Sequence, residues 1–134
     1  MSISHYRELD VWRLAMSLAK QTYQLTASFP REERFGLTSQ LQRSAVSIPS
    51  NIAEGNARHS TRDYARFVSM SLGSCAELQT QLLLTGDLDV GDAQMREAAI
   101  ELCDRVGQML QRLHQSLIRR LRAESPVPSP ESRS

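Results

Sequence analysis

Three arginines in the middle of the chain are the residues whose type and spacing point most directly to chemistry. Arg58, Arg62 and Arg66 recur at intervals of four residues, and His59 lies beside the first of them. Like charges at this spacing on a helix repel each other unless an anion binds, and guanidinium groups bind phosphate well. The pattern indicates a surface that contacts nucleic-acid phosphates in a salt-sensitive, sequence-independent way. Arg43 joins this surface if its segment is a neighbour, and a simply solvated helix face is the alternative.

A group of polar residues around a proline is the second candidate site. Two carboxylates held close together could perform acid–base catalysis. The alternative is a hydrogen-bonded network that satisfies the backbone near the proline or a subunit interface. The set consists of Pro49, Asn51, Glu54, Gly55, Ser71, Ser74 and Glu77.

Other kinds of catalytic or cofactor site have no sequence signature here. Helical bundles can hold two metal ions through Glu-x-x-His pairs, but His114 has Gln111 three positions before it, and His5 and His59 fall outside the predicted helices. Nucleophile elbows, phosphate-binding loops and dinucleotide-binding glycine motifs are also missing. We therefore expect no catalytic residue, no metal site and no cofactor, and we predict that the protein is not an enzyme.

Composition is that of an ordinary globular protein without a strong electrostatic bias. The 134 residues are 40% hydrophobic and 23% charged, with a formal net charge of +1, and Lys20 is the only lysine among 16 basic residues. The first residues lack the apolar region of a signal peptide, and no apolar run is long enough to span a bilayer. Cys75 and Cys103 are not part of a Cys-x-x-Cys motif, so we interpret both as buried, reduced thiols. These features predict a cytoplasmic protein with no membrane partner.

Four segments with helical periodicity must position the candidate residues. The first extends from about Glu8 to Ser28 and ends before Pro30, because a residue preceding proline is disfavoured in the α conformation. It has two adjacent apolar stripes, which predict a helix covered on more than one side, as in a bundle that associates with copies of itself. The first stripe is Leu9, Trp12, Met16, Ala19, Tyr23 and Thr26, and the second is Val11, Leu14, Leu18 and Leu25.

The second segment, from about Leu37 to Glu54, contains Pro49. A proline inside a helix removes one backbone donor and crowds the carbonyl four residues earlier, at a cost of about 3 kcal/mol. Apolar residues continue with the same period to Ile52, so we predict one kinked helix rather than two. Gly55 would then supply the left-handed residue that commonly ends a helix.

The third and fourth segments have clear starting signals. Ser60 is the expected N-cap of a helix that extends to about Thr85, with Asp63 as an acidic capping-box residue, and Asp92 is the expected cap of a helix over residues 93–123. The middle of the third helix is rich in small residues, which we expect to face the kinked part of the second. These small residues are Ser69, Ser71, Gly73, Ser74 and Ala76.

The fourth segment is the longest and has basic final turns. Its apolar stripe is Met95, Ala99, Leu102, Val106, Met109 and Leu113, and Cys103, Leu110 and Leu117 broaden it. Arg119, Arg120 and Arg122 are favourable near a helix C-terminus. Residues 124–134 are rich in proline and serine and are predicted to be a disordered tail outside a domain of residues 1–123. Four helices with short connections predict an all-α, antiparallel up-down-up-down four-helix bundle.

Several short segments resemble one protein family. They are LDVW at residues 9–12, FP at 29–30, ERFGL at 33–37, QLQRSAVSIPSNIAEG at 40–55 and GSCAELQTQL at 73–82. These segments resemble the four-helix-bundle family of 23S ribosomal RNA intervening sequences, also called the S23 ribosomal protein family. The resemblance extends over about residues 5–120, and the run Ser-Ile-Pro-x-Asn-Ile-Ala-Glu-Gly is its most specific part.

The resemblance implies an all-helical bundle that assembles into a homopentamer, a ring of five bundles. The family is similar to the accessory variability determinant of diversity-generating retroelements, a basic pentamer that binds nucleic acid and a reverse transcriptase. This chain differs from that branch in being nearly neutral. The leading hypothesis is a non-enzymatic pentameric scaffold that contacts RNA through Arg58, Arg62 and Arg66, with the Arg119–Arg122 end as a further candidate contact. The alternative is a module for protein–protein assembly, with no nucleic-acid role, that uses the exposed second stripes of the first and fourth helices.

Overall fold

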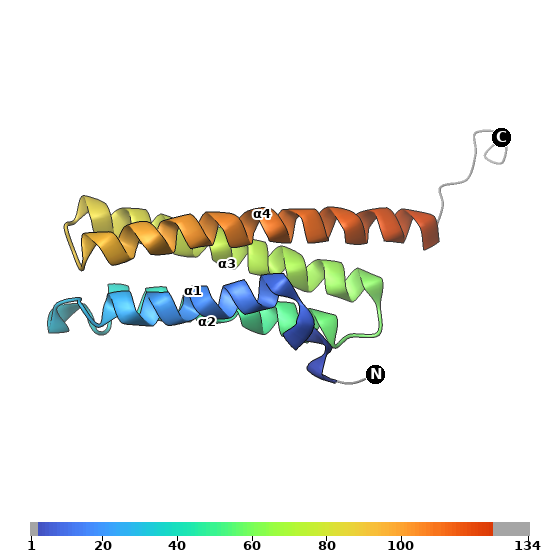
Figure 1. Ribbon diagram of the computed structural model, residues 1–134, viewed down its shortest axis with the longest axis horizontal. Coiled ribbons are helices and arrows are strands. Elements are labelled where there is room, and N and C mark those ends of the chain that lie inside the picture. Colours follow the sequence, from blue (N-terminus) through green and yellow to red (C-terminus); the bar gives the residue numbers. More distant parts are fainter. Residues whose placement is uncertain (1–2, 125–134) are drawn as a thin grey trace.

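The computed structural model describes residues 3–124, and within this range the chain consists of helices and their connections, with no strand. The four main helices lie side by side along one long axis (Figure 1). Helix α4 extends past the others at one end, and its 32 residues correspond to a length of about 48 Å. The α-helices are α1 (Asp10–Thr26), α2 (Leu37–Asn56), α3 (Thr61–Asp87) and α4 (Ala93–Glu124), and the short 3-10 helices are η1 (Ile3–Glu8) and η2 (Arg31–Glu33).

Both predicted N-caps are confirmed. The Ser60 hydroxyl accepts a hydrogen bond from the backbone N–H of Asp63 at 3.2 Å, and the Asp92 carboxylate accepts one from Met95 at 2.9 Å. Each bond satisfies one of the backbone donors that a helix leaves free at its start. The predicted bounds differ by one to two residues at several ends, and Glu124 belongs to α4 rather than to the tail. The tail residues 125–134 lie outside the described residues.

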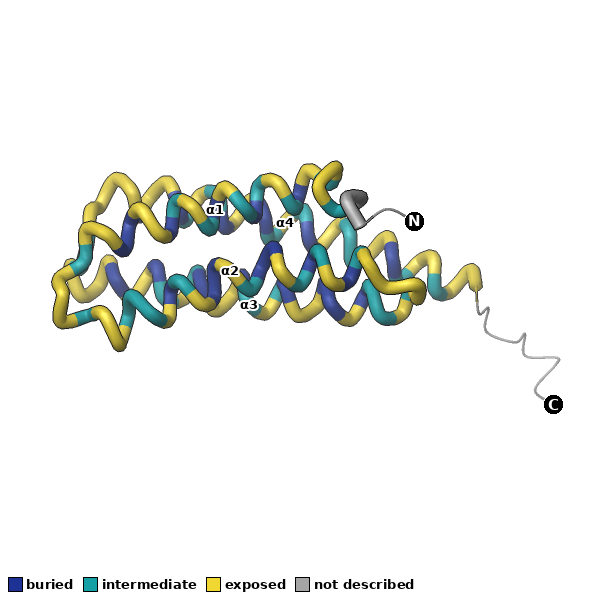
Figure 2. Tube along the Cα trace, turned by 90° about the horizontal axis from the view of Figure 1, so that it is seen from below, coloured by how far each residue is buried: buried dark blue, intermediate teal, exposed yellow. Residues whose placement is uncertain are grey.

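The core contains the stripe of α1 that we expected to be exposed. Val11, Leu18 and Leu25 are buried, whereas Tyr23 on the other stripe is 48% exposed and Met16 is only half-buried. In helix α4, Cys103, Leu110 and Leu117 are also buried, together with Ala99 and Val106 of the first stripe, while Met95 is 44% exposed. Figure 2 shows the buried positions of each helix turned toward the other helices. The prediction that the second stripes of the first and fourth helices are exposed is therefore wrong. Sequence alone cannot distinguish two equally apolar stripes, because only the packing of the helix decides which stripe faces a neighbouring helix.

Helix α2 passes through Pro49 without interruption, which confirms one helix rather than two. Pro49 is buried, and next to it the Ser71 hydroxyl donates to the backbone carbonyl of Ile48 at 2.9 Å. The prediction that Gly55 ends the helix in a left-handed conformation is wrong, because α2 continues to Asn56 and, of the described glycines, only Gly91 has a positive φ.

Gly55 instead allows α2 and α3 to approach closely. A Cβ atom added to Gly55 would lie 2.7 Å from Cβ of Phe67 and 3.1 Å from Cδ1 of Tyr64. Such distances are far inside van der Waals contact, so no other residue fits here without movement of a helix. The glycine is therefore a packing requirement of the interface rather than a stop signal.

Only part of the small-residue region of α3 faces α2. Ser71 is buried and Ser74 half-buried against α2, but Ser69, Gly73 and Ala76 are exposed. The expectation that all five face α2 is wrong for these three because a helix turns by about 100° per residue, so five positions within eight residues cannot share one face.

A buried arginine stabilises the connection between α3 and α4 through hydrogen bonds. Arg96 donates from Nε to the Thr85 hydroxyl at 3.2 Å, and from Nη2 to the backbone carbonyls of Val90 at 2.9 Å and Gly91 at 3.4 Å. It is only 8% exposed and has no carboxylate partner among the described residues. Arg96 therefore belongs to the fold and is not available as a surface charge.

Candidate nucleic-acid interface

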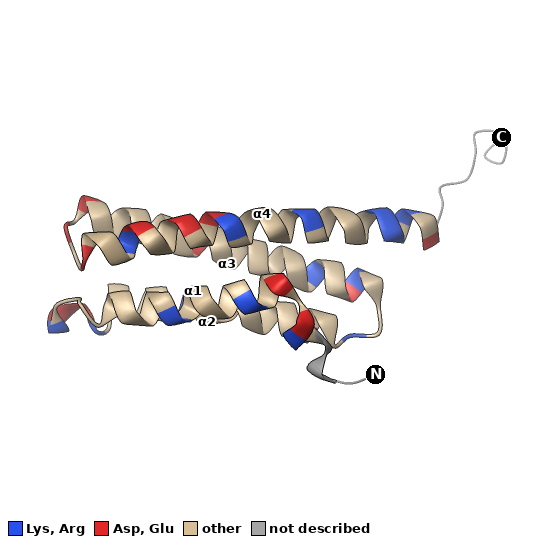
Figure 3. Cartoon of the chain, viewed as in Figure 1, with Lys and Arg blue, Asp and Glu red and all other residues tan. Residues whose placement is uncertain are grey.

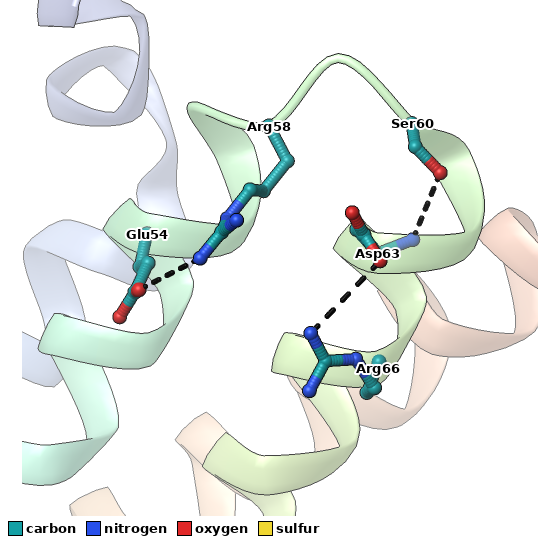
Figure 4. A network of polar contacts seen from close by, with 5 residues as sticks. All are labelled: Glu54, Arg58, Ser60, Asp63 and Arg66. Atoms are coloured by element: carbon teal, nitrogen blue, oxygen red, sulfur yellow. Dashed lines mark hydrogen bonds and ion pairs between the residues drawn. The ribbon is translucent and has the colours of Figure 1, made fainter.

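The three central arginines lie at one end of the bundle, around the connection between α2 and α3. Arg58 follows the last turn of α2, and Arg66 lies in the second turn of α3 (Figure 4). Arg62 lies in the first turn of α3. The side chains of Arg58 and Arg66 are 43% and 60% exposed, and Arg62 is exposed as well. The structure therefore places all three where a large polyanion can reach them.

Two of these arginines are held over one aromatic ring. The guanidinium carbon of Arg58 lies 4.9 Å from the centroid of the Phe67 ring, and that of Arg66 lies 4.8 Å from it. The face of an aromatic ring attracts a cation, by about 0.5–1 kcal/mol at exposed sites. Phe67 is itself buried in the α2–α3 interface, so it acts as a platform that limits the motion of both side chains.

Carboxylates partly neutralise the same two arginines. Nη2 of Arg58 lies 3.0 Å from Oε1 of Glu54, and Nη2 of Arg66 lies 3.9 Å from Oδ1 of Asp63 (Figure 4). Exposed pairs of this kind contribute at most about 1 kcal/mol, so a phosphate can compete with them. Arg62 has no ion-pair partner within residues 3–124, so its positive charge is the least neutralised of the three.

The last turns of α4 lie beside the start of α3 and add further positive charge. The Thr61 hydroxyl donates to the Glu124 carboxylate at 3.4 Å, which joins the two helix ends. Arg120 of α4 is close enough to Tyr64 of α3 for its charge to act on the phenol. Burial raises the pKa of the Tyr64 phenol, while a hydrogen bond from Asn56 and the positive charge of Arg120 partly offset this rise. Figure 3 shows the basic residues of both helices at this end of the molecule. We call this group the arginine end; it consists of Arg58, Arg62, Arg66, Arg119, Arg120 and Arg122.

Acidic residues gather toward the other end, along the α3–α4 connection and the first half of α4 (Figure 3). The near-neutral net charge therefore conceals a separation of charge along the long axis. Such a separation orients an approaching polyanion toward the basic end. The acidic residues are Asp87, Asp89, Asp92, Glu97, Glu101 and Asp104.

Arg43 is not brought to the arginine end. It lies on α2, 13 residues before Asn56 at the end of that helix, which corresponds to about 20 Å along the axis. Its Nη2 donates to the Ser39 hydroxyl at 3.3 Å, and it lines a shallow hollow with Tyr23 and Val46. Any role of Arg43 in binding would therefore be separate from that of Arg62 and Arg66.

The predicted polar network exists along the α2–α3 interface, with different members. Ser47 and Ser74 share a hydrogen bond of 2.7 Å, and the Asn51 amide donates to the Ser47 carbonyl at 2.9 Å and to its hydroxyl at 3.1 Å. Farther along, the Ser44 hydroxyl donates to Oε1 of Glu77 at 2.9 Å. Ser44 and Ser47 are the residues that we missed; the available signal was their position seven and four residues before Asn51, which places all three on one face of a helix.

Glu54 is outside this network, which corrects its predicted place beside Glu77. Glu54 lies one residue before Gly55, the residue that faces Phe67, whereas Glu77 bonds to Ser44. Ten residues separate Ser44 from Glu54 along α2, a rise of about 15 Å. This is much more than the roughly 5–10 Å between paired catalytic carboxylates, so the two do not form an acid–base pair.

Among residues 3–124, no group of three or more histidine, cysteine, aspartate or glutamate side chains could hold a metal ion. No helix in this part of the chain is long and apolar enough to cross a membrane.

Comparison with known protein families gives a match over most of the chain. A family model described as "23S rRNA-intervening sequence protein" matches residues 7–112. This range includes Arg58, Arg62, Arg66 and the α2–α3 interface, but not the last turns of α4. No curated protein matches the chain.

Proposed function

The chain belongs to the 23S rRNA-intervening sequence protein family, since the family model spans most of its length, and on this basis we propose that it is a non-enzymatic, self-assembling scaffold that contacts RNA through the arginine end. The single observation that carries this proposal is the convergence of arginines from two distant parts of the sequence. Arg62 and Arg66 lie in the first two turns of α3, Arg120 lies in the last two turns of α4, and a hydrogen bond between Thr61 and Glu124 joins the two helix ends.

The geometry of these arginines suits phosphates rather than bases. Arg58 and Arg66 lie over Phe67, whose own ring is buried beneath them and is not free to stack on a base. Guanidinium groups on a convex helix end reach a phosphate backbone without entering a groove, which gives contacts independent of sequence. A folded RNA with closely spaced phosphates is therefore the favoured ligand class.

Self-assembly would place several copies of the arginine end on one particle. We propose an antiparallel up-down-up-down bundle that forms a ring of five in the cytoplasm, as the family resemblance implies. The half-buried stripe of α1 supports association, because Met16 and Tyr23 offer apolar surface that the isolated bundle does not cover. Five arginine ends on one ring would raise the apparent affinity well above that of a single copy.

A salt titration tests the RNA proposal. Binding of the full-length protein to a structured RNA, measured by fluorescence anisotropy between low and physiological salt, is expected to weaken steeply. Each phosphate contact contributes about 0.7–0.9 to the slope of log K against log salt, so contacts by Arg58, Arg62 and Arg66 alone predict a slope of about −2 to −3 per copy. Contacts by the exposed Arg119, Arg120 and Arg122 would make the slope steeper. Absence of binding at low salt, or binding that ignores salt, would contradict the proposal.

The assembly proposal has its own test. Met16→Glu places a charge on the half-buried stripe of α1 and is expected to reduce the assembled fraction in sedimentation velocity more than tenfold, with helix content unchanged. The matched control is Ser17→Glu, which adds the same charge at the adjacent exposed position. Equal effects of the two substitutions, or no effect of either, would argue against an interface on this stripe.

An assembly module with no nucleic-acid role is the second candidate. Exposed apolar residues on the α1–α2 side favour it, namely Tyr23 at 48% and Val46 at 42% exposure. The salt titration separates the two candidates, because a module of this kind would assemble without binding RNA at any salt concentration.

A further inference from the structure

Two free cysteines meet across the interface of α3 and α4. Cys75 lies on α3 and Cys103 on α4, and the thiol of Cys103 donates to the backbone carbonyl of Cys75 at 3.4 Å. The neighbouring Cys103 thiol and burial raise the pKa of Cys75, while the Cys75 thiol lowers the pKa of Cys103 against the opposing effects of burial and the charge of Asp104. The sequence contains only these two cysteines, so the fold has brought its entire thiol content to one point.

The thiols are buried but border an open groove. Cys75 is 5% exposed and Cys103 1% exposed. Both line a groove of about 290 Å³ between α3 and α4, next to Ala76 and Gly107. A Cβ atom added to Gly107 would have no neighbour within 4 Å, so no side chain closes the groove at that point. A molecule as small as a peroxide can approach the two sulfur atoms from this side.

We propose that Cys75 and Cys103 form a dithiol modification site, which a peroxide or a low-molecular-weight disulfide converts into a disulfide that joins α3 to α4. Ordinary buried cysteines are inert because they lack both an access path and a second thiol within reach. This pair has both, because the Cys103 thiol contacts Cys75 and both residues line the groove. The proposal is independent of RNA binding.

The reaction balances with hydrogen peroxide as the oxidant. The thiolate of Cys103, whose charge the Cys75 thiol stabilises, attacks one peroxide oxygen; the O–O bond breaks, a sulfenic acid forms and the first water leaves. Cys75 then loses its proton and attacks the sulfenic sulfur, so the S–S bond forms, the S–O bond breaks and the second water leaves. Two thiols lose two electrons and two protons in total, and the peroxide is reduced to water.

The experiment uses the reduced full-length protein in its native assembly, treated with hydrogen peroxide. Intact mass is expected to fall by the mass of two hydrogen atoms per chain, titratable thiols to fall from two to none, and one non-reduced peptide to contain both cysteines. Dithiothreitol should reverse all three changes. Because the disulfide closes a loop of more than 25 residues, the thermal midpoint should rise by about 10 °C. Addition of oxygen to the mass, a covalent dimer or no reaction would each overturn the proposal.

A matched variant keeps two cysteines but separates them. Cys75→Ala combined with Ser69→Cys moves one thiol by six residues, about 9 Å along α3, to an exposed position. This variant is expected to keep its helix content and to form no intrachain disulfide under the same treatment. If it crosslinks within one chain as fast as the natural sequence, the pairing reflects a transiently unfolded chain, and the dithiol site is refuted.

Discussion

Replacing Arg62 and Arg66 together with glutamate is expected to weaken binding of a structured RNA by at least about a hundredfold at low salt. Each lost charge-assisted hydrogen bond is worth about 1.5–3 kcal/mol, and the new carboxylates repel phosphate. The slope of log K against log salt should become shallower by about two per copy, because two phosphate contacts disappear. Anisotropy titrations at several salt concentrations give both values.

The matched control reverses the same number of charges at the opposite end of the bundle. Arg31→Glu with Arg34→Glu changes the net charge equally, and both residues are exposed around η2. This control is expected to weaken binding less than fivefold, through long-range electrostatics alone. If the two double variants lose equal affinity, binding follows net charge and the arginine end is not the contact surface. Arg43→Glu, measured alongside, shows whether that residue contributes from its separate position.

Replacing Gly55 with alanine is expected to destabilise the protein by about 2–3 kcal/mol, against the usual trend. In a helix interior this substitution normally stabilises by up to about 1 kcal/mol, because alanine has the higher helix propensity. Here the new Cβ would lie 2.7 Å from Cβ of Phe67, an atom that moves only with the backbone of α3. Overpacking of this kind costs about 1–3 kcal/mol, and the displaced Phe67 also loses its contacts with Arg58 and Arg66.

Gly73→Ala is the matched control for this prediction. Gly73 lies inside α3, and a Cβ atom added there would have no neighbour within 4 Å. Urea denaturation at one fixed protein concentration should show stabilisation by about 0.5–1 kcal/mol for Gly73→Ala and destabilisation for Gly55→Ala. Shifts of the same sign for both would contradict the close approach of α2 and α3.

The helices and their caps could be predicted from the sequence, whereas the role of Gly55 could not. Hydrophobic periodicity located all four helices, and hydrogen-bonding caps at Ser60 and Asp92 located two of their starts, because each signal acts within one or two turns. The role of Gly55 could not be found in this way. A glycine near a predicted helix end suggests a left-handed cap, whereas its actual function depends on Phe67, which lies 12 residues later.

In the candidate site, too, contacts within one helix could be predicted and contacts between helices could not. Arg62 and Arg66 could be predicted as neighbours on an exposed face, since positions four apart on a helix always are. Their platform on Phe67 and their proximity to the end of α4 could not, because these contacts join different helices. Equally, Glu54 and Glu77 looked like a pair, and the register between α2 and α3 separates them by about 15 Å.

The sequence by itself determined the family, the helices, their caps and the exposed arginine face. The family follows from the resemblance of whole segments, and the helices, their caps and the arginine face follow from local spacing on a helix of 3.6 residues per turn. Only the tertiary structure decided which apolar stripe of α1 is buried, that Arg96 is internal, and that Cys75 meets Cys103. Those outcomes depend on the rotation and register of each helix against its neighbours. Contacts between residues far apart in the chain set both, and local periodicity carries no information about them.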